Sequence, residues 1–255
     1  MDKTTCGRPD GSACGTGASI GITERGDPAL DISWTDRMGG VAMAILITKN
    51  LNDRFLEAVE PFKHKVVVHV SCTGFGGKVV EPGVRPAAWT RERYDLLAGI
   101  VGAERTVLRV DPIIPTAKGV ATAEGVLRLF EDSAVQRVRW SLMDMYRHVA
   151  DRFSQADLPH PYRGRFSPST EDRTQAQEML ARWTRRYRLE SCAESGGFGL
   201  GCISGRDTDA VGLDEAILQG SAGQRKECLC PGNKTELLSK PKRCGHQCLY
   251  CYWKD

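Results

Sequence analysis

The sequence lacks any apolar run close to the ~18 residues that a membrane-spanning helix needs. Its first residues, Met1 to Cys6, contain no apolar core of the kind that marks a secretory signal. The formal net charge of +3 is too small to indicate a polyanionic partner by itself. These absences argue against a membrane or secreted protein, and we expect one of the reducing cytoplasm.

Cysteine, by contrast, is abundant and unevenly placed. A chain of 255 residues can bury a full hydrophobic core without covalent staples, so its ten cysteines need another explanation. Secreted disulfide frameworks belong to short chains with evenly spread cysteines. Seven of the ten lie beyond residue 190, namely Cys192, Cys202, Cys228, Cys230, Cys244, Cys248 and Cys251. This crowding predicts metal ligation.

The last three cysteines form a C-x3-C-x2-C loop, with Cys244, Cys248 and Cys251 as its thiols and Tyr250 just before the third. Thiolates at this spacing can hold three corners of a [4Fe-4S] cubane from one short loop. The fourth iron would then stay open to a ligand. The loop therefore predicts a reactive cluster.

The four thiols upstream of this loop match the number that fully ligates a second cubane. We therefore predict a second [4Fe-4S] cluster held by Cys192, Cys202, Cys228 and Cys230. A zinc site and simple buried thiols are the alternatives. The single residue between Cys228 and Cys230 is too tight for the usual zinc knuckle. His246 could complete a zinc site with three thiolates, although its place inside the loop strains tetrahedral closure.

Arginines gather between residues 137 and 188. Arg137 and Arg139 begin this stretch, which also includes Arg163, Arg165, Arg182, Arg185, Arg186 and Arg188. A solvated helix face explains such a series. A groove for nucleic acid or for a phosphate-bearing substrate is the competing interpretation.

Apolar, β-rich runs alternate with amphipathic stretches along most of the chain, after an irregular arm over residues 1–17. Strands are predicted at 41–47, 66–71, 106–110, 137–142 and 187–192, with weaker candidates at 30–34 and 200–204. Helices are predicted at 52–62, 90–101, 122–133, 169–185 and 214–219. This alternation predicts a parallel sheet with right-handed crossovers.

Six to eight strands in this length fit a (β/α) barrel of the TIM type, complete or partial, over residues 18–220. We expect residues 221–255 to form a Cys-rich segment packed across the barrel mouth. An open, doubly wound sheet is the alternative. Both architectures place their chemistry at the carboxyl ends of the strands, where polar residues follow several predicted strands. They are Thr48, Lys49, Asn50, Arg109, Asp111, Asp144, Tyr146 and Glu194.

The cysteine loop with its aromatic residue resembles the radical S-adenosylmethionine signature. Further segments, in this order, resemble the family known as domain of unknown function 1848. They are Ile32-Ser33-Trp34-Thr35-Asp36-Arg37, Thr48-Lys49-Asn50, Arg109-Val110-Asp111-Pro112-Ile113, Ser141-Leu142-Met143-Asp144-Met145-Tyr146, Cys192-Ala193-Glu194, Gly201-Cys202-Ile203 and the run from Gln224 to Cys230. The resemblance extends from about residue 30 to the end of the sequence. Two segments depart from it, the long glycine-rich start and Pro231 to Arg243, so we expect substrate contacts near them to differ.

The resemblance implies an iron-sulfur enzyme that reductively cleaves S-adenosylmethionine to a 5′-deoxyadenosyl radical, which abstracts hydrogen from a substrate. It also implies an external reductant such as flavodoxin or ferredoxin. On this basis Lys49, Arg109, Asp111, Asp144 and Glu194 are candidates for catalysis, and Thr48, Asn50, Tyr146 and Tyr250 for binding the cosubstrate. The alternative is a nucleic-acid-binding module in which zinc or a structural cluster holds the thiols and the arginine-rich face contacts the polyanion.

Overall fold

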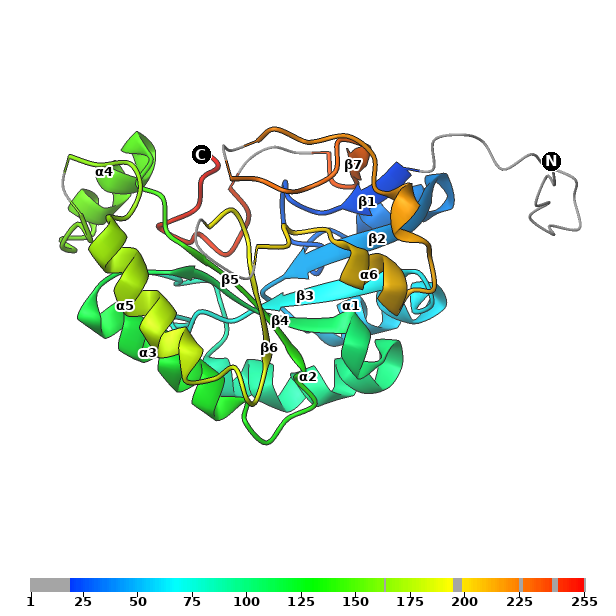
Figure 1. The fold of residues 1–255 in the computed structure, drawn as a ribbon, viewed down its shortest axis with the longest axis horizontal. Helices are drawn as coiled ribbons and strands as arrows, with labels where there is room; N and C mark the ends of the chain where they lie inside the picture. The colour runs from blue at the N-terminus through cyan, green and yellow to red at the C-terminus, as the bar shows by residue number, and fades with distance from the viewer. Residues whose placement is uncertain (1–18, 163, 195–198, 225–226, 240–242, 255) are drawn as a thin grey trace, which may run out of the picture.

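The predicted strands join into one parallel sheet in the computed structural model (Figure 1). The structure describes residues 19–162, 164–194, 199–224, 227–239 and 243–254. Its strands are β1 (Ser19–Ile22), β2 (Val41–Thr48), β3 (Val66–Ser71), β4 (Thr106–Ile113), β5 (Arg137–Leu142), β6 (Arg188–Ser191) and β7 (Lys234–Glu236). The predicted arm over residues 1–17, with Cys6 and Cys14, lies outside the described residues, and so does Arg163.

Helices connect the strands. The α-helices are α1 (Asp53–Val59), α2 (Ala87–Val101), α3 (Ala117–Leu129), α4 (Arg147–Gln155), α5 (Thr170–Ala181) and α6 (Gly205–Ala210). The 3-10 helices are η1 (Ile32–Gly40), η2 (Glu60–Phe62), η3 (Ala103–Arg105) and η4 (Glu215–Ile217). None of the helices in the described part of the chain combines the length and apolar composition that a bilayer crossing requires.

The strand order is β6-β5-β4-β3-β2-β1-β7, and each pair is parallel. Because successive strands are neighbours and parallel crossovers are right-handed, the connecting helices lie on one face of the sheet, as α2, α3 and α5 do in Figure 1. After β6 the chain passes over the other face and adds β7 beside β1, at the far edge (Figure 1).

The sheet is open, so the predicted barrel is not confirmed. A barrel closes when the two strands at the edges of its sheet pair with each other. Here β7 does pair with β1, yet β6 at the other edge pairs only with β5 among the described strands, and nothing bridges β6 to β7. The described residues between β6 and β7 cross the face of the sheet and do not extend its edge.

Strand residues alternate between two different environments. On β5, Val138, Trp140 and Leu142 belong to the apolar core beneath the helices. Their neighbours Arg137 and Arg139 are also almost fully buried, on the opposite face. That second face changes along the sheet, because on β1 and β2 it carries apolar residues such as Ile20, Met43 and Ile45. The apolar helix layer supplies the core, and the other face holds the polar site.

The five main strand predictions are confirmed, with shifts of a few residues at their ends. The two weaker ones are wrong. Residues 30–34 run into the 3-10 helix η1, where the Asp31 side chain accepts a hydrogen bond from the backbone N of Ser33. Residues 200–204 form no strand, and only an isolated bridge joins Gly199 to Ser191. The short strands β1 and β7 and the helices α4 and α6 were not predicted from the sequence.

Helix starts were predicted less well than helix existence. Ser169 caps α5 in a capping box with Asp172, as the sequence indicates, although the helix ends at Ala181. The start predicted at Thr122 is wrong, because the Thr116 side chain accepts from Gly119 N and begins α3 earlier. Helix α2 likewise begins at Ala87, ahead of Thr90.

Candidate functional site

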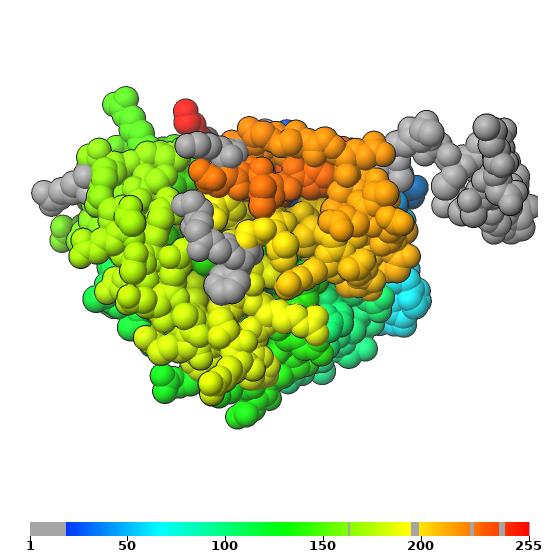
Figure 2. Space-filling view, in the orientation of Figure 1, coloured from blue at the N-terminus to red at the C-terminus, as the bar shows by residue number. Residues whose placement is uncertain are grey.

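One cavity of about 440 Å³ opens where the carboxyl ends of the strands meet the segment that follows β6. Strands β2 to β5 contribute polar side chains that include Thr48, Ser71, Arg109 and Ser141. The outside of this covering segment is seen in gold and orange in Figure 2. All seven cysteines beyond residue 190 line the cavity: Cys192, Cys202, Cys228, Cys230, Cys244, Cys248 and Cys251.

The C-terminal cysteine loop is fixed to the body of the protein by backbone contacts. Gly83 N donates to the carbonyl of His246 at 3.1 Å, and Leu249 N donates to the carbonyl of Val80 at 3.0 Å. A Cβ at Gly83 would lie 2.5 Å from the carbonyl oxygen of Gly245, so only glycine permits this approach. Arg152 of α4 donates to the carbonyl of Cys251 at 2.6 Å. Two separate parts of the fold, the loop between β3 and α2 and the helix α4, therefore hold the loop in place.

The imidazole of His246 points back into the fold. Its Nε2 lies 2.7 Å from a carboxylate oxygen of Asp27, and its Nδ1 lies 3.0 Å from the carbonyl oxygen of Gly83. Both neighbours are hydrogen-bond acceptors, an arrangement that favours the cationic ring with a proton on each nitrogen. Burial opposes that charge, but the hydrogen bond and charge of Asp27 outweigh it and raise the pKa of His246. Both ring nitrogens already have protein partners, so the zinc alternative that uses this residue would require His246 to leave Asp27 and Gly83.

Lys49 lies on a second side of the loop, where it forms an ion pair of 3.0 Å with the buried carboxylate of Glu81. Thr73 donates to the other Glu81 oxygen at 2.7 Å, and Tyr250 donates to the same carboxylate. The Lys49 ammonium also lies 5.4 Å from the centre of the Tyr250 ring. Lys49 and Tyr250, separate in the sequence, are thus brought together near Cys248.

These contacts fix the charges. Burial penalises the ammonium of Lys49, but Glu81 and then Cys248 outweigh it, and the pKa of Lys49 is raised. Burial likewise opposes the Glu81 carboxylate, yet Lys49, Tyr250 and Thr73 lower its pKa. Lys49 is therefore a permanent cation and not a base. Burial raises the pKa of the Cys248 thiol to about 12 against the opposing charge of Lys49.

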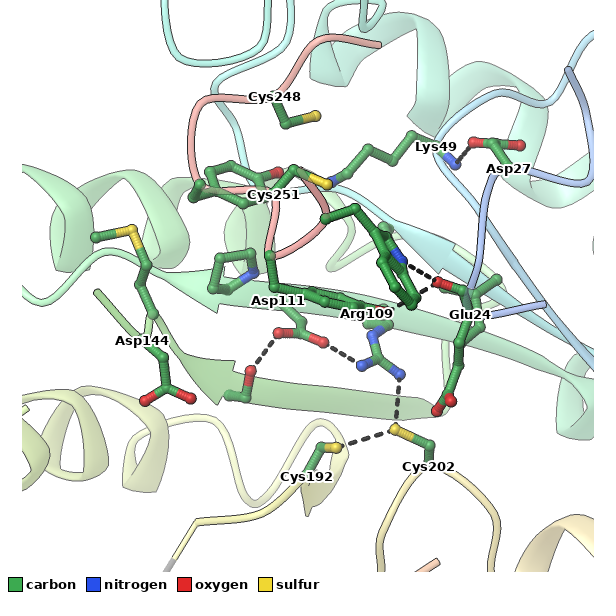
Figure 3. Close-up of a pocket in the computed structure, with 18 of the residues that line it drawn as sticks. Glu24, Asp27, Lys49, Arg109, Asp111, Asp144, Cys192, Cys202, Cys248 and Cys251 are labelled. Carbon is green, nitrogen blue, oxygen red and sulfur yellow. Dashed lines mark hydrogen bonds and ion pairs between the residues drawn. The ribbon is translucent and has the colours of Figure 1, made fainter. Parts of the chain in front are cut away.

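Arg109 and Asp111 form an ion pair in the middle of the cavity wall (Figure 3). Ser141 of the neighbouring strand donates to Asp111. The Arg109 guanidinium also lies 3.4 Å from Cys202 Sγ. Asp144 lines the cavity on another side and accepts from Ser167 at 2.8 Å. The ends of β4 and β5 therefore present one cation and two carboxylates to the same space.

Of the four remaining predicted site residues, two line the cavity and two do not. Thr48 lines the cavity and donates to Asp27 at 2.7 Å, and Tyr146 lines it at the start of α4. Asn50 is not among the lining residues, and its backbone N donates to the Thr48 hydroxyl. Glu194 is also absent from the lining, since its carboxylate accepts from Leu142 N at 2.8 Å and pairs with Arg173.

Of the upstream cysteines, Cys192 and Cys202 lie across the cavity from Cys248 and Cys251 (Figure 3), and Cys228 and Cys230 pack in one cluster with Cys192 and Cys202. Cys192 Sγ and Cys202 Sγ are 2.9 Å apart, and Cys202 N donates to Cys230 Sγ at 3.1 Å. Hydrogen bonds from Cys192 and Cys230, aided by the charge of Arg109, hold the pKa of Cys202 well below its usual range. Among the residues that the structure describes, no three His, Cys, Asp or Glu side chains are arranged to hold a single metal ion.

The arginine-rich stretch is partly exposed, with Arg165, Arg182, Arg185 and Arg188 at the surface, and partly buried. Arg137 is buried and paired with Glu190 and Asp207. Arg186 donates to main-chain carbonyls near the end of α3, and Arg188 pairs with Glu104. These arginines are used within the fold.

Sequence reasoning missed Asp27 and Glu81 as site residues, and it considered His246 only as a possible zinc ligand. Asp27 accepts four hydrogen bonds, from Ala29 N, Lys49 N, Thr48 and His246. It lies between predicted elements, and its partners are 21 to 219 residues away apart from Ala29. No local pattern marks such a residue. Glu81 lies in a loop after glycines, which gives an equally weak signal.

Comparison with protein families identifies the chain. The family model described as Domain of unknown function (DUF1848) matches residues 33–253, which is most of the sequence. The chain belongs to this family. A search of curated proteins finds no match.

Proposed function

We propose that this member of the DUF1848 family is an iron-sulfur enzyme of the radical S-adenosylmethionine type. One observation carries the proposal: the three thiols of the C-x3-C-x2-C loop line the same cavity as the carboxyl ends of the strands. Parallel sheets bind ligands at those ends. The donors suit a [4Fe-4S] cluster, since Cys244, Cys248 and Cys251 are three thiols on one short, firmly held loop.

The sheet itself supports the proposal at the level of architecture. Strands β1 to β6 follow one another without the reversal of order that a doubly wound sheet shows. We propose that they form an opened (β/α) barrel, with the Cys-rich segment across its mouth. Such an arrangement leaves one face free for a cavity, and the chain after β6 covers it.

When bound, the cluster and S-adenosylmethionine would supply the reductive cleavage that yields a 5′-deoxyadenosyl radical. The protein's residues would bind, orient and shield. Lys49, held as a cation by Glu81, offsets the negative charge that thiolates place beside it. Because burial raises the pKa of Cys248, ligation by metal has to drive its deprotonation.

Arg109, Asp111 and Asp144 would hold the polar groups of the cosubstrate and substrate. The guanidinium can bind a carboxylate of the ligand, and the two carboxylates can bind its amino or hydroxyl groups. Tyr252 and Trp253 also line the cavity, and both donate to the carbonyl of Glu24, at 2.8 and 2.9 Å. They close the wall near the end of the chain and help to exclude water from the cavity.

The test compares anaerobically reconstituted wild type with two cysteine variants. Cys248→Ala should abolish release of 5′-deoxyadenosine from S-adenosylmethionine under reducing conditions, measured by liquid chromatography. Cys72→Ala is the matched control, since Cys72 is buried in the apolar core and does not line the cavity. It should retain release. Absence of 5′-deoxyadenosine from the reconstituted wild type, or wild-type release by Cys248→Ala, would overturn the proposal.

A further inference from the structure

Three separate segments bring four thiols to one wall of the cavity. Cys192 follows β6, Cys202 follows ten residues later, and Cys228 and Cys230 come from the segment that returns towards β7. The sulfurs of Cys192 and Cys202 are in contact at 2.9 Å, and Cys230 Sγ accepts from Cys202 N. Because these segments of the stretch after β6 pack their four cysteines into one cluster, the cysteines form a built group.

Local backbone geometry places the segments together. Gly201 has a φ of +72°, and a Cβ there would lie 3.1 Å from Leu229 C and 3.2 Å from Cys230 N. The glycine therefore lets the Cys202 loop approach the Cys230 segment closely. On its other side that segment is fixed by Ala222 N, which donates to the carbonyl of Cys230 at 2.9 Å.

Two buried arginines contact Cys202 from the sheet. Arg109 lies 3.4 Å from its sulfur, and Arg139 donates to its carbonyl oxygen at 2.7 Å. Both arginines extend from strands of the sheet, so the position of this thiol is tied to β4 and β5. A guanidinium beside a sulfur favours the thiolate, the form that ligates metals.

We infer that Cys192, Cys202, Cys228 and Cys230 hold a second iron-sulfur cluster that faces the same cavity as the C-terminal loop. Four thiolates satisfy a [4Fe-4S] cubane completely and leave no open iron, in contrast to the three of the loop. The single residue between Cys228 and Cys230 does not suit a structural zinc site, whose paired thiols are spaced by about two to four residues. The role of the cavity between the two groups of thiols rests on the proposed function. The presence of a cluster at the four upstream cysteines does not.

The positions of the four sulfurs also indicate what must change when a cluster binds. Each thiolate of a cubane binds a different iron, so the four sulfurs must surround a cage instead of converging on one point. The absence of a single-ion site among the described residues is compatible with that. Since Cys192 and Cys202 touch, a cluster would have to part their sulfurs.

The experiment measures iron and sulfide per chain after anaerobic reconstitution. We expect about eight irons in wild type and in Cys72→Ala, and about four in the double variant Cys192→Ala, Cys202→Ala. The double variant should keep the electron paramagnetic resonance signal that responds to S-adenosylmethionine. A triple variant of the C-terminal loop should also bind about four irons, with a signal that does not respond.

A second measurement works on wild type alone and does not depend on how a variant folds. Reconstituted and metal-free protein are alkylated, and mass spectrometry follows each cysteine. Protection of the four upstream thiols on loading supports the inference. About four irons in wild type with those thiols equally reactive in both samples would overturn it, as would zinc in their place. About eight irons without 5′-deoxyadenosine would overturn the proposed function and leave the second cluster standing.

Discussion

The two faces of strand β5 bury different kinds of side chain. On the helix side, Val138, Trp140 and Leu142 pack into the apolar core. On the cavity side, Arg137 and Arg139 meet the carboxylates of Glu190 and Asp207, and all four side chains are at most 1% exposed. A strand buried on both faces of a parallel sheet is usually apolar throughout. On β5, only the face that carries Arg137 and Arg139, and that supports the thiols, departs from this rule.

This difference separates stability from placement. Buried ion pairs seldom stabilise a fold more than well-packed apolar side chains would, because desolvating the charges is costly. The helix side therefore supplies the larger share of stability per residue. The charged side fixes positions: Arg139 joins Glu190 and Asp207 to the carbonyl of Cys202 at 2.7 Å. We infer that the first face holds the fold and the second orders the site.

Replacement of Arg139 by methionine should have the largest effect. The change leaves Glu190 and Asp207 with Arg137 as their remaining buried partner and frees the Cys202 carbonyl. Breaking such a network is expected to lower the free energy of unfolding by about 3 to 5 kcal/mol. Chemical denaturation measures that loss, and the iron content of the folded protein should fall as well.

Arg188→Met is the matched control at the start of the neighbouring strand. Arg188 pairs with Glu104 at 2.9 Å, but both side chains are about half exposed. Its loss should change the free energy of unfolding by less than about 1 kcal/mol. Equal stability of Arg139→Met and Arg188→Met would show that the buried network does not act as a unit.

A smaller change on the opposite face tests the same comparison. Val138 lies between the two arginines in sequence, and its side chain belongs to the apolar core. Val138→Ala removes two methyl groups and should cost about 2 kcal/mol in unfolding free energy. Iron bound per folded chain should stay at the wild-type level. If it falls as far as in Arg139→Met, the two faces cannot be separated in this way.

The sequence was informative where structure is local. Five strands and the parallel sheet follow from apolar, β-rich runs, and the thiols that line the cavity follow from their crowding. Arg137 and Arg139 look like part of a solvated cationic stretch because their partners are distant. The carboxylates of Glu190 and Asp207 come 53 and 70 residues after Arg137. Periodicity over a window of a dozen residues cannot detect such pairs.

Whether the sheet closes could not be predicted from the sequence, for the same reason. Strands β1 and β7 have four and three residues, too few for a periodic signal. Whether the sheet closes depends on where β7 pairs, and it pairs with β1 across more than 200 residues of chain. The docking of the cysteine loop through His246 and Asp27 is equally non-local.

Acid should weaken the charged face gradually while it spares the apolar one. Burial opposes the charge of Glu190, but Arg139 and then Arg137 outweigh it, so the pKa of Glu190 lies below its ordinary value of 4.5. A carboxyl group whose pKa is lowered by folding stabilises the native state above its unfolded pKa. That contribution is lost as pH falls through the folded value.

The free energy of unfolding should therefore decline as the pH is lowered below about 4.5, and denaturation at a series of pH values measures the decline. Glu190→Gln cannot release or take up this proton, so its decline should be shallower than that of wild type. Val138→Ala should shift the whole curve down without changing its shape, because an apolar contact does not titrate. Parallel curves for wild type and Glu190→Gln would mean that Glu190 is not held as a carboxylate by the two arginines, and the assignment of the cavity side as a charged support for Cys202 would fail with it.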